Sequence, residues 1–201
     1  MPLSTNFGSD KIPRGFRVDI WGGVSIPAAN ARITITSGQP DATENASAVH
    51  LGRTTDGAEL GAGGGLTPRK SDDYSAPYDY VRGDDEMMSI KANILRAFDF
   101  AVRALLTNHA THSAASGYDQ LTYGGKQGAI VANGFVAIVR LPEASPAKYY
   151  VFHIYQGVNN APFSGRFKRA GDPTSFAIDI QAVQVVTRAE GDQLGNEWQQ
   201  A

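Results

Sequence analysis

Short runs in which apolar and polar residues alternate restrict the fold of this chain more than any other feature of its sequence. In two of them every second residue is apolar, at Phe16, Val18 and Ile20 and at Phe176, Ile178 and Ile180. A period of two places successive side chains on opposite faces of an extended backbone, so each run predicts a strand with one buried face. Glycines and prolines lie between such runs and favour the short connections of an all-β protein.

Further short runs complete a predicted antiparallel sheet. The expected strands are 15–21, 31–36, 74–81, 87–91, 129–140, 148–156, 162–169 and 174–187. The length of 201 residues suits one all-β unit, so we expect a single domain over 1–201.

Three segments lack this alternation. The polar segment 39–48 predicts an extended loop. The segment 60–74 predicts a flexible loop or arm, because residues 61–65 include four glycines. The polar segment 188–201 predicts a C-terminal arm that projects from the domain.

One segment has the three- and four-residue spacing of a helix. Asn93 can cap its start, because the side-chain oxygen can accept a free backbone N–H of the first turn, and the helix should end near Asn108. The apolar residues expected to share its core face are Ile94, Leu95, Phe98, Val102, Leu105 and Leu106. Because a helix with one apolar stripe must bury it on a sheet, the predicted fold class is mainly β with one flanking amphipathic α-helix and long loops.

The composition narrows the classes of function. A formal net charge of −2 lacks the basic excess typical of nucleic-acid binding. The absence of cysteine excludes disulfides, thiolate metal sites and cysteine nucleophiles. The N-terminus lacks the layout of a secretion signal, and no apolar run approaches the roughly 18 residues of a membrane helix, so we expect a soluble chain.

Common signatures of catalysis are also missing from the sequence. It contains neither the G-x-S-x-G motif of serine hydrolases nor a P-loop. His109 and His112 have a spacing that could serve a metal, but no carboxylate lies at a matching step. A solvated helix end is the preferred interpretation of these histidines. We therefore expect no catalytic residue, no cofactor and no metal.

Three segments in chain order carry a resemblance to a known family. They are LGRTTDGAEL at 51–60, the stretch 78–95 with RGDDE and IKANIL, and FKRAGDPTSFAI at 167–178. Their order of strand, turn, strand, helix and final hairpin resembles the major tail tube proteins of long-tailed, siphophage-type bacteriophages.

The resemblance implies a fold and an assembly. The fold would be a tail-tube-type β-sandwich or barrel, and the subunits would form hexameric rings that stack into the hollow tail tube used for genome delivery. The partners would be further copies of the chain and the tape measure, distal tail and terminator proteins. The protein would belong to the virion tail, assembled in the host cytoplasm without a membrane.

DNA would pass through the lumen of such a tube without specific binding. A basic wall would hold DNA by releasing counterions, so the wall should be acidic or neutral. Asp19 and Asp179, each on the polar phase of an alternating strand, are the candidates to face the lumen.

Other functions remain open. The chain could be another phage tail ring protein, such as a terminator, a distal tail protein or a connector. It could also be a soluble β-sandwich binding module, for which exposed aromatics such as Tyr149, Tyr150 and Tyr155 would be needed. An enzyme ranks last.

Overall fold

The computed structural model describes residues 17–29, 31–69, 79–95, 99–107, 110–123, 132–141, 147–162 and 175–200. Within these ranges the chain is mainly β with one short helix, which confirms the predicted fold class. The elements in chain order are β1 (Val18–Val24), β2 (Ile35–Thr36), β3 (Gln39–Pro40), β4 (Val49–Arg69), β5 (Asp79–Ile94), α1 (Phe100–Leu106), β6 (Ala110–Ala115), β7 (Tyr118–Tyr123), β8 (Asn133–Arg140), β9 (Tyr149–Asn159), β10 (Phe176–Ala182) and β11 (Gly195–Gln199).

Seven strands form one antiparallel sheet in the order β10-β5-β4-β1-β8-β9-β11. One edge of β9 pairs with β8, and its other edge pairs with β11 at residues 150–154 and with β10 at residues 157–159. The β9–β10 pairing returns the sheet to its first strand. Six strands therefore close on themselves, and β11 extends the sheet outside this ring.

The main hydrophobic core fills the inside of the closed sheet. Every second residue of a strand contributes to it, as the period of two predicts, and the predicted Val18 and Ile20 of β1 are both buried there. The other strand residues of this core are Leu51, Met88, Ile90, Ile94, Phe135, Ala137, Phe152, Ile154, Phe176, Ile178 and Ile180.

A second hydrophobic cluster lies on the outer face of β1, β8 and β9. The segment between β1 and β4 folds back over this face and buries Ile33 and Ile35 there. Of the strand expected at 31–36, only Ile35–Thr36 pairs, with Gln39–Pro40. Of the loop expected at 39–48, residues 39–40 form β3, and residues 41–48 form turns without a strand or helix.

The start of the helix differs from the prediction. Asn93 and Ile94 are not helical: they end β5 and pair with Ala177 and Phe176 of β10. A ladder with a strand far along the chain outweighs the local preference of asparagine for a helix cap. Leu95 lies in a bend after β5, outside the helix.

The helix itself begins after Asp99. The Asp99 carboxylate accepts hydrogen bonds from the backbone N–H groups of Ala101 (2.9 Å) and Val102 (3.3 Å). Val102 and Leu106 are buried in the main core, and Leu105 packs against it. The predicted apolar face is thus shorter than expected, and Phe98 lies outside the described residues.

The glycine-rich segment expected to form a loop or arm at 60–74 is a strand as far as Arg69. It continues β4 and pairs with β5 out to Arg69 opposite Asp79. Glycine is a poor strand former because of its backbone entropy, but a continuous partner strand supplies the ladder that local propensity does not. Residues 70–74 lie outside the described ranges.

The polar segment expected to project at 188–201 packs on the sheet instead. Its residues Gly195–Gln199 form β11 and pair with β9. Arg188 anchors the preceding loop, because its guanidinium forms an ion pair with Asp192 (2.6 Å) and donates to the carbonyl of Pro27 (2.7 Å).

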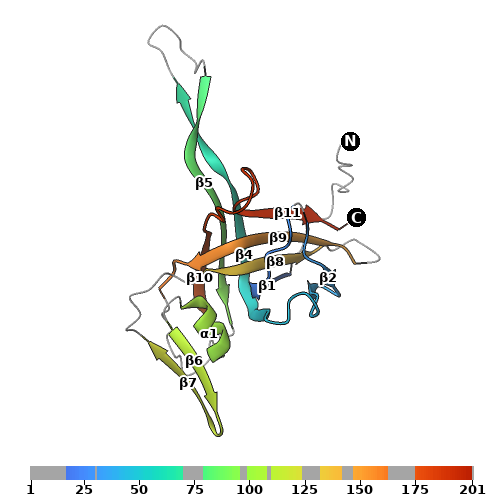
Figure 1. Cartoon of the computed structure of the whole chain (residues 1–201), viewed down its shortest axis with the longest axis vertical. Coiled ribbons are helices and arrows are strands. Elements are labelled where there is room, and N and C mark those ends of the chain that lie inside the picture. Colours follow the sequence, from blue (N-terminus) through green and yellow to red (C-terminus); the bar gives the residue numbers. More distant parts are fainter. Residues whose placement is uncertain are drawn as a thin grey trace.

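Two hairpins extend from opposite ends of the closed sheet (Figure 1). β4 and β5 form a long twisted ribbon at one end, and β6 and β7 form a shorter hairpin beyond α1 at the other. Among the described residues, no helix combines the length and the apolar character needed to cross a membrane.

Candidate functional site

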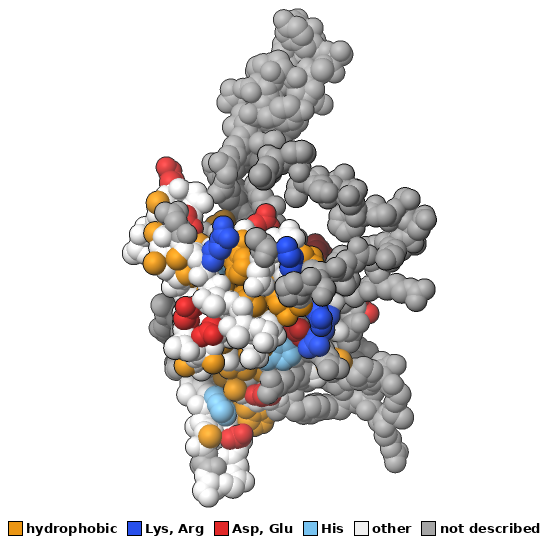
Figure 2. Space-filling view, turned by 90° about the vertical axis from the view of Figure 1, so that its right-hand side faces the viewer, with side chains coloured by type: hydrophobic (Ala, Val, Ile, Leu, Met, Phe, Trp, Pro, Cys, Tyr) orange, Lys and Arg blue, Asp and Glu red, His pale blue; other side chains and the backbone are white. Residues whose placement is uncertain are grey.

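Charges of both signs are interspersed on the side of the molecule that carries the segment between β1 and β4. Figure 2 shows acidic, basic and hydrophobic side chains mixed over this face, without a patch of a single sign among the described residues. A nucleic-acid interface would need clustered basic side chains. Contact with DNA phosphates is therefore not what this face favours.

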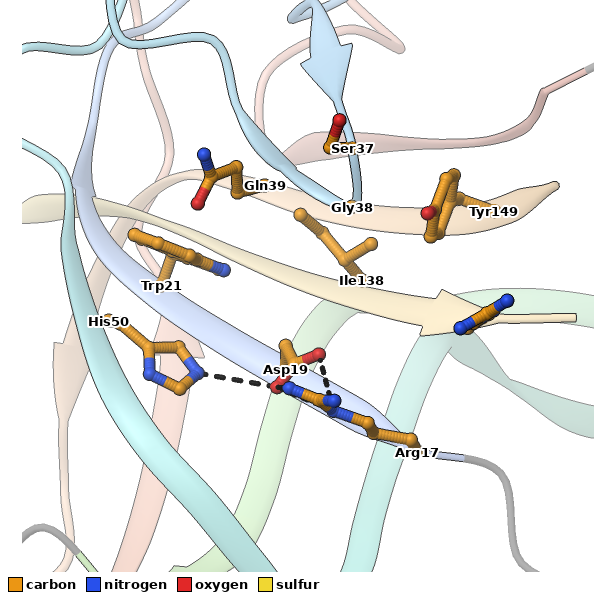
Figure 3. Close-up of a pocket in the computed structure, with 10 residues that line it drawn as sticks. Arg17, Asp19, Trp21, Ser37, Gly38, Gln39, His50, Ile138 and Tyr149 are labelled. Atoms are coloured by element: carbon orange, nitrogen blue, oxygen red, sulfur yellow. Dashed lines mark hydrogen bonds and ion pairs between the residues drawn. The ribbon is translucent and has the colours of Figure 1, made fainter. Parts of the chain in front are cut away.

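An open pocket lies on the outer face of the sheet, beneath the segment between β1 and β4 (Figure 3). Its volume is about 320 Å³, at the lower end of the range for small-ligand sites. β1, β4, β8 and β9 supply its floor and walls, and the turn between β2 and β3 forms its rim.

Strand register determines which side chains meet on the pocket floor. Residues directly opposite in antiparallel strands share a face of the sheet. Asp19 of β1 is opposite Ile138 of β8, and Trp21 of β1 is opposite His50 of β4. These four side chains therefore lie side by side on the outer face.

Asp19 is the centre of a charge cluster in this pocket. Its carboxylate lies 3.0 Å from Arg17 Nε and 3.4 Å from His50 Nε2. The His50 ring packs against Trp21, with centroids 4.9 Å apart. Because the Asp19 side chain is only 18% exposed, these two partners compensate a carboxylate that has lost much of its hydration.

Arg140, at the end of β8, faces Arg17, which lies just before β1 on the neighbouring strand. The backbone N–H of Arg140 donates to the carbonyl of Arg17 (3.3 Å), which places the two residues opposite each other at the ends of β8 and β1. Like charges directly opposite in a sheet are destabilising. Arg17 has Asp19 as its counter-ion, whereas no ion pair of Arg140 occurs within the described ranges. Arg140 is thus an exposed guanidinium of the pocket for which the described residues supply no counter-ion.

The rim of the pocket is a tight hairpin turn. Ser37 (φ 54°) and Gly38 (φ 83°) are both left-handed, as type I′ turns require. A Cβ on Gly38 would lie 2.9 Å from the ring of Tyr149, so only glycine lets the turn rest on that ring. The turn is thereby held against the sheet and keeps the pocket narrow.

This arrangement favours binding over catalysis. His50 and Asp19 could share a proton, but Figure 3 shows Ser37 across the pocket from His50, with Gln39 and Trp21 nearer to it. Ser37 is therefore not placed next to this pair. An uncompensated guanidinium beside an aromatic and aliphatic floor is suited to an anionic group on an apolar stem.

The two candidates for the lumen are not brought together by the fold. Asp19 lies in the pocket, whereas Asp179 lies on the outer face of β10, opposite Lys91 of β5. Lys91 is in turn opposite Glu59 of β4. The side chains of Glu59, Lys91 and Asp179 therefore form a row across the outer side of β4, β5 and β10, with the positive charge between two negative ones. Glu59 and Lys91 are exposed, and Asp179 is half-buried. We call this surface the polar face.

The three tyrosines considered for an aromatic platform are dispersed. Tyr149 lines the pocket, and the adjacent Tyr150 points to the other side of β9, where it donates its hydroxyl to Glu197. Tyr155 is fully buried and donates to Asp192 (2.7 Å). They do not form a joint exposed surface of the kind expected for a carbohydrate-binding module.

The remaining described histidines have separate environments. His112 lies in β6 rather than at a helix end, with its Nε2 3.9 Å from Asp119, and His109 lies outside the described residues. His153 is fully buried in β9. Over the described ranges, no cluster of three or more histidine or carboxylate side chains is arranged to hold a metal ion.

Most of the pocket was not visible in the sequence. The one local signal is that Arg17 and Asp19 share the polar phase of a predicted strand. His50 and Arg140 become their neighbours only through the pairing of β1 with β4 and β8.

Comparison with known proteins gives no assignment. No protein-family model matches the sequence, and no curated protein matches it. The function therefore has to be argued from the residues and the geometry described above.

Proposed function

We propose that this protein is a structural, self-assembling subunit of the phage tail tube type. In this proposal hexameric rings stack into a hollow tube in the virion tail, built in the host cytoplasm with the tape measure, distal tail and terminator proteins as neighbours. The observation that carries the proposal is the β4–β5 ribbon, which extends well beyond the body of the closed sheet (Figure 1).

The outer part of this ribbon has no third strand beside it among the described residues. β10 pairs with β5 only between Ser89 and Ile94. From Gly63 opposite Met87 outward, β4 and β5 pair with each other alone in the described structure. A two-stranded ribbon is marginally stable in water at best, and its free edges invite pairing with another chain. Neighbouring copies of the chain would supply strand or side-chain partners for the ribbon. Met87 at its base is 52% exposed and is available for such contacts.

The two projecting hairpins also give the molecule a direction. The β4–β5 ribbon and the β6–β7 hairpin lie at opposite ends of the closed sheet and differ in length and sequence (Figure 1). Contacts between unlike ends are heterologous, and such contacts can propagate without limit along an axis. This polarity supports stacking of rings better than it supports a symmetric dimer.

The polar face is the surface we assign to the channel. Glu59, Lys91 and Asp179 give it two carboxylates and one ammonium group per subunit. Repeated around a six-membered ring, this excess of negative charge would keep DNA from binding to the wall, because basic side chains are what hold the phosphate backbone. Of the two acidic candidates, Asp179 belongs to this face.

A variant that lacks residues 66–82 tests the proposal. It joins Gly65 to Gly83 and removes strand pairs in which β4 and β5 pair with each other alone. We expect its free energy of unfolding to stay within about 1 kcal/mol of the full chain, while assembly is lost. Sedimentation velocity over a range of concentrations, with negative-stain electron microscopy, measures the assembly.

The full chain is the reference in this experiment. A full chain that stays monomeric at every concentration would overturn the proposal, and a shortened variant that still assembles would remove the ribbon from the interface. Single closed rings without tubes would favour the terminator, distal tail or connector alternative.

Cysteine labelling tests the channel assignment, because the chain has no native cysteine. Lys91→Cys in the assembled tube should react with a small maleimide, while a maleimide on a long polyethylene glycol chain should react far more slowly, since the wall of a narrow channel is open only to small reagents. The matched control is Lys91→Cys in the variant that lacks residues 66–82, where both reagents should react alike. Equal rates in the assembled tube would place the polar face on the outside.

A further inference from the structure

We propose that the pocket under the β2–β3 turn binds a carboxylate carried on an apolar or aromatic stem, with Arg140 as the anion-binding residue. This inference does not depend on the assembly proposed above. It rests on three features that lie together: the exposed guanidinium of Arg140, for which the described residues supply no counter-ion, the facing Arg17, which is paired with Asp19, and an apolar floor.

Two arginines and one carboxylate line the pocket, and this excess of positive charge favours an anion. Arg17 and Arg140 lie opposite each other, and Arg17 is paired with Asp19 at 3.0 Å. His50 also contacts Asp19, at 3.4 Å, so the one carboxylate of the pocket is already engaged from two sides. A bound carboxylate would relieve the repulsion between the two arginines, and a guanidinium can hold a carboxylate by two parallel hydrogen bonds.

The floor of the pocket is apolar, so it favours an anion that is attached to an apolar group. Ile138 lies at its centre, with Trp21 to one side and Tyr149 under the rim (Figure 3). The Trp21 indole N–H is buried and has no hydrogen-bond partner among the described residues. A ligand with an apolar body would cover Trp21 and Tyr149, the two half-buried aromatic side chains of the lining. The pocket of about 320 Å³ has room for one ring or one to two amino-acid side chains.

The bound carboxylate could come from an acidic side chain of a neighbouring copy or from a free small molecule. Carboxylate binding as such is tested first, on the full chain at a concentration at which it is monomeric. Phenylacetate and its neutral isostere phenylacetamide are the probes, and ligand-observed saturation-transfer NMR gives their dissociation constants. We expect phenylacetate to bind about ten-fold more tightly than phenylacetamide or better, and more tightly than inorganic phosphate, which cannot use the floor.

Arg140→Gln removes the charge and keeps a polar side chain of similar length. It should abolish the preference for phenylacetate over phenylacetamide. Arg32→Gln is the matched control, because Arg32 is an exposed arginine over the Trp198 ring on the same side of the sheet but outside the pocket. Equal binding of acid and amide by the native chain, tighter binding of phosphate than of phenylacetate, or equal effects of Arg140→Gln and Arg32→Gln would each overturn the proposal.

Assembly then identifies the source of the carboxylate. If phenylacetate disperses assembled particles and Arg140→Glu prevents their formation while Arg32→Glu does not, the anion belongs to a neighbouring copy. If probe binding requires Arg140 but assembly is indifferent to both, the pocket serves a free small carboxylate. If the chain binds phenylacetate but never assembles, the tail tube proposal is wrong and the carboxylate-binding proposal is supported.

Discussion

Replacing Phe135 with alanine is expected to lower the free energy of unfolding by about 3–5 kcal/mol, the range for truncation of a buried aromatic side chain. Phe135 is 1% exposed inside the closed sheet. Its ring packs against the backbone of both neighbouring strands: a Cβ on Gly22 would lie 2.9 Å from the ring, and one on Gly157 would lie 3.0 Å from it. Strands held by their own hydrogen bonds cannot close in on the cavity, so we expect little relaxation.

Urea denaturation followed by circular dichroism, at a concentration at which the chain is monomeric, measures this loss. Tyr118→Ala is the matched control, because Tyr118 is 63% exposed on β7 and should change stability by less than about 0.5 kcal/mol. A similarly small effect of Phe135→Ala would contradict a core packed inside the closed sheet.

Acidification from neutral pH to pH 4 is expected to remove about 3 kcal/mol of stability through His153 alone. Burial of the ring, assisted by the positive charge of Arg188, lowers the pKa of His153 from 6.5 to about 4. Between these two values the unfolded chain binds a proton that the folded chain excludes. The contribution is therefore fully present above pH 6.5 and is lost as the pH falls towards 4.

His153→Leu should flatten this part of the stability profile. Neither ring nitrogen of His153 has a hydrogen-bond partner among the described residues, so leucine sacrifices no bond and the fold should be retained. His112→Leu is the control, because it removes a histidine that is partly exposed on β6 and lies outside the main core. Parallel declines of the native chain and His153→Leu between pH 6.5 and 4 would show that a buried neutral histidine is not the cause.

The local alternation of residues was enough to predict β1 and β10 and the side that each of them buries, whereas β4, β6, β7 and β11 were not predicted from it. Val18 and Ile20 lie inside the closed sheet, as do Ile178 and Ile180, because a period of two is a property of the extended backbone itself. The mainly β class and the single helix follow from the same kind of information, since apolar spacing is read within one segment.

Which distant segments pair as strands was decided by the tertiary structure. Asn93 and Ile94 have the local character of a helix start, but pairing with β10 makes them a strand. The glycines after residue 60 have the local character of a loop, but β5 pairs with them as far as Arg69. In each case a ladder formed across the chain contributes more than a propensity worth less than about 1 kcal/mol per residue.

In the candidate pocket, too, one part could be predicted from the sequence and the rest depends on the tertiary structure. The sequence shows Arg17 and Asp19 in one phase of one strand. The approach of His50 from β4 and of Arg140 from β8, and the placing of Gly38 on the Tyr149 ring, follow from strand order and register. Register depends on which buried faces fit together around a closed sheet, a non-local condition that no single segment encodes.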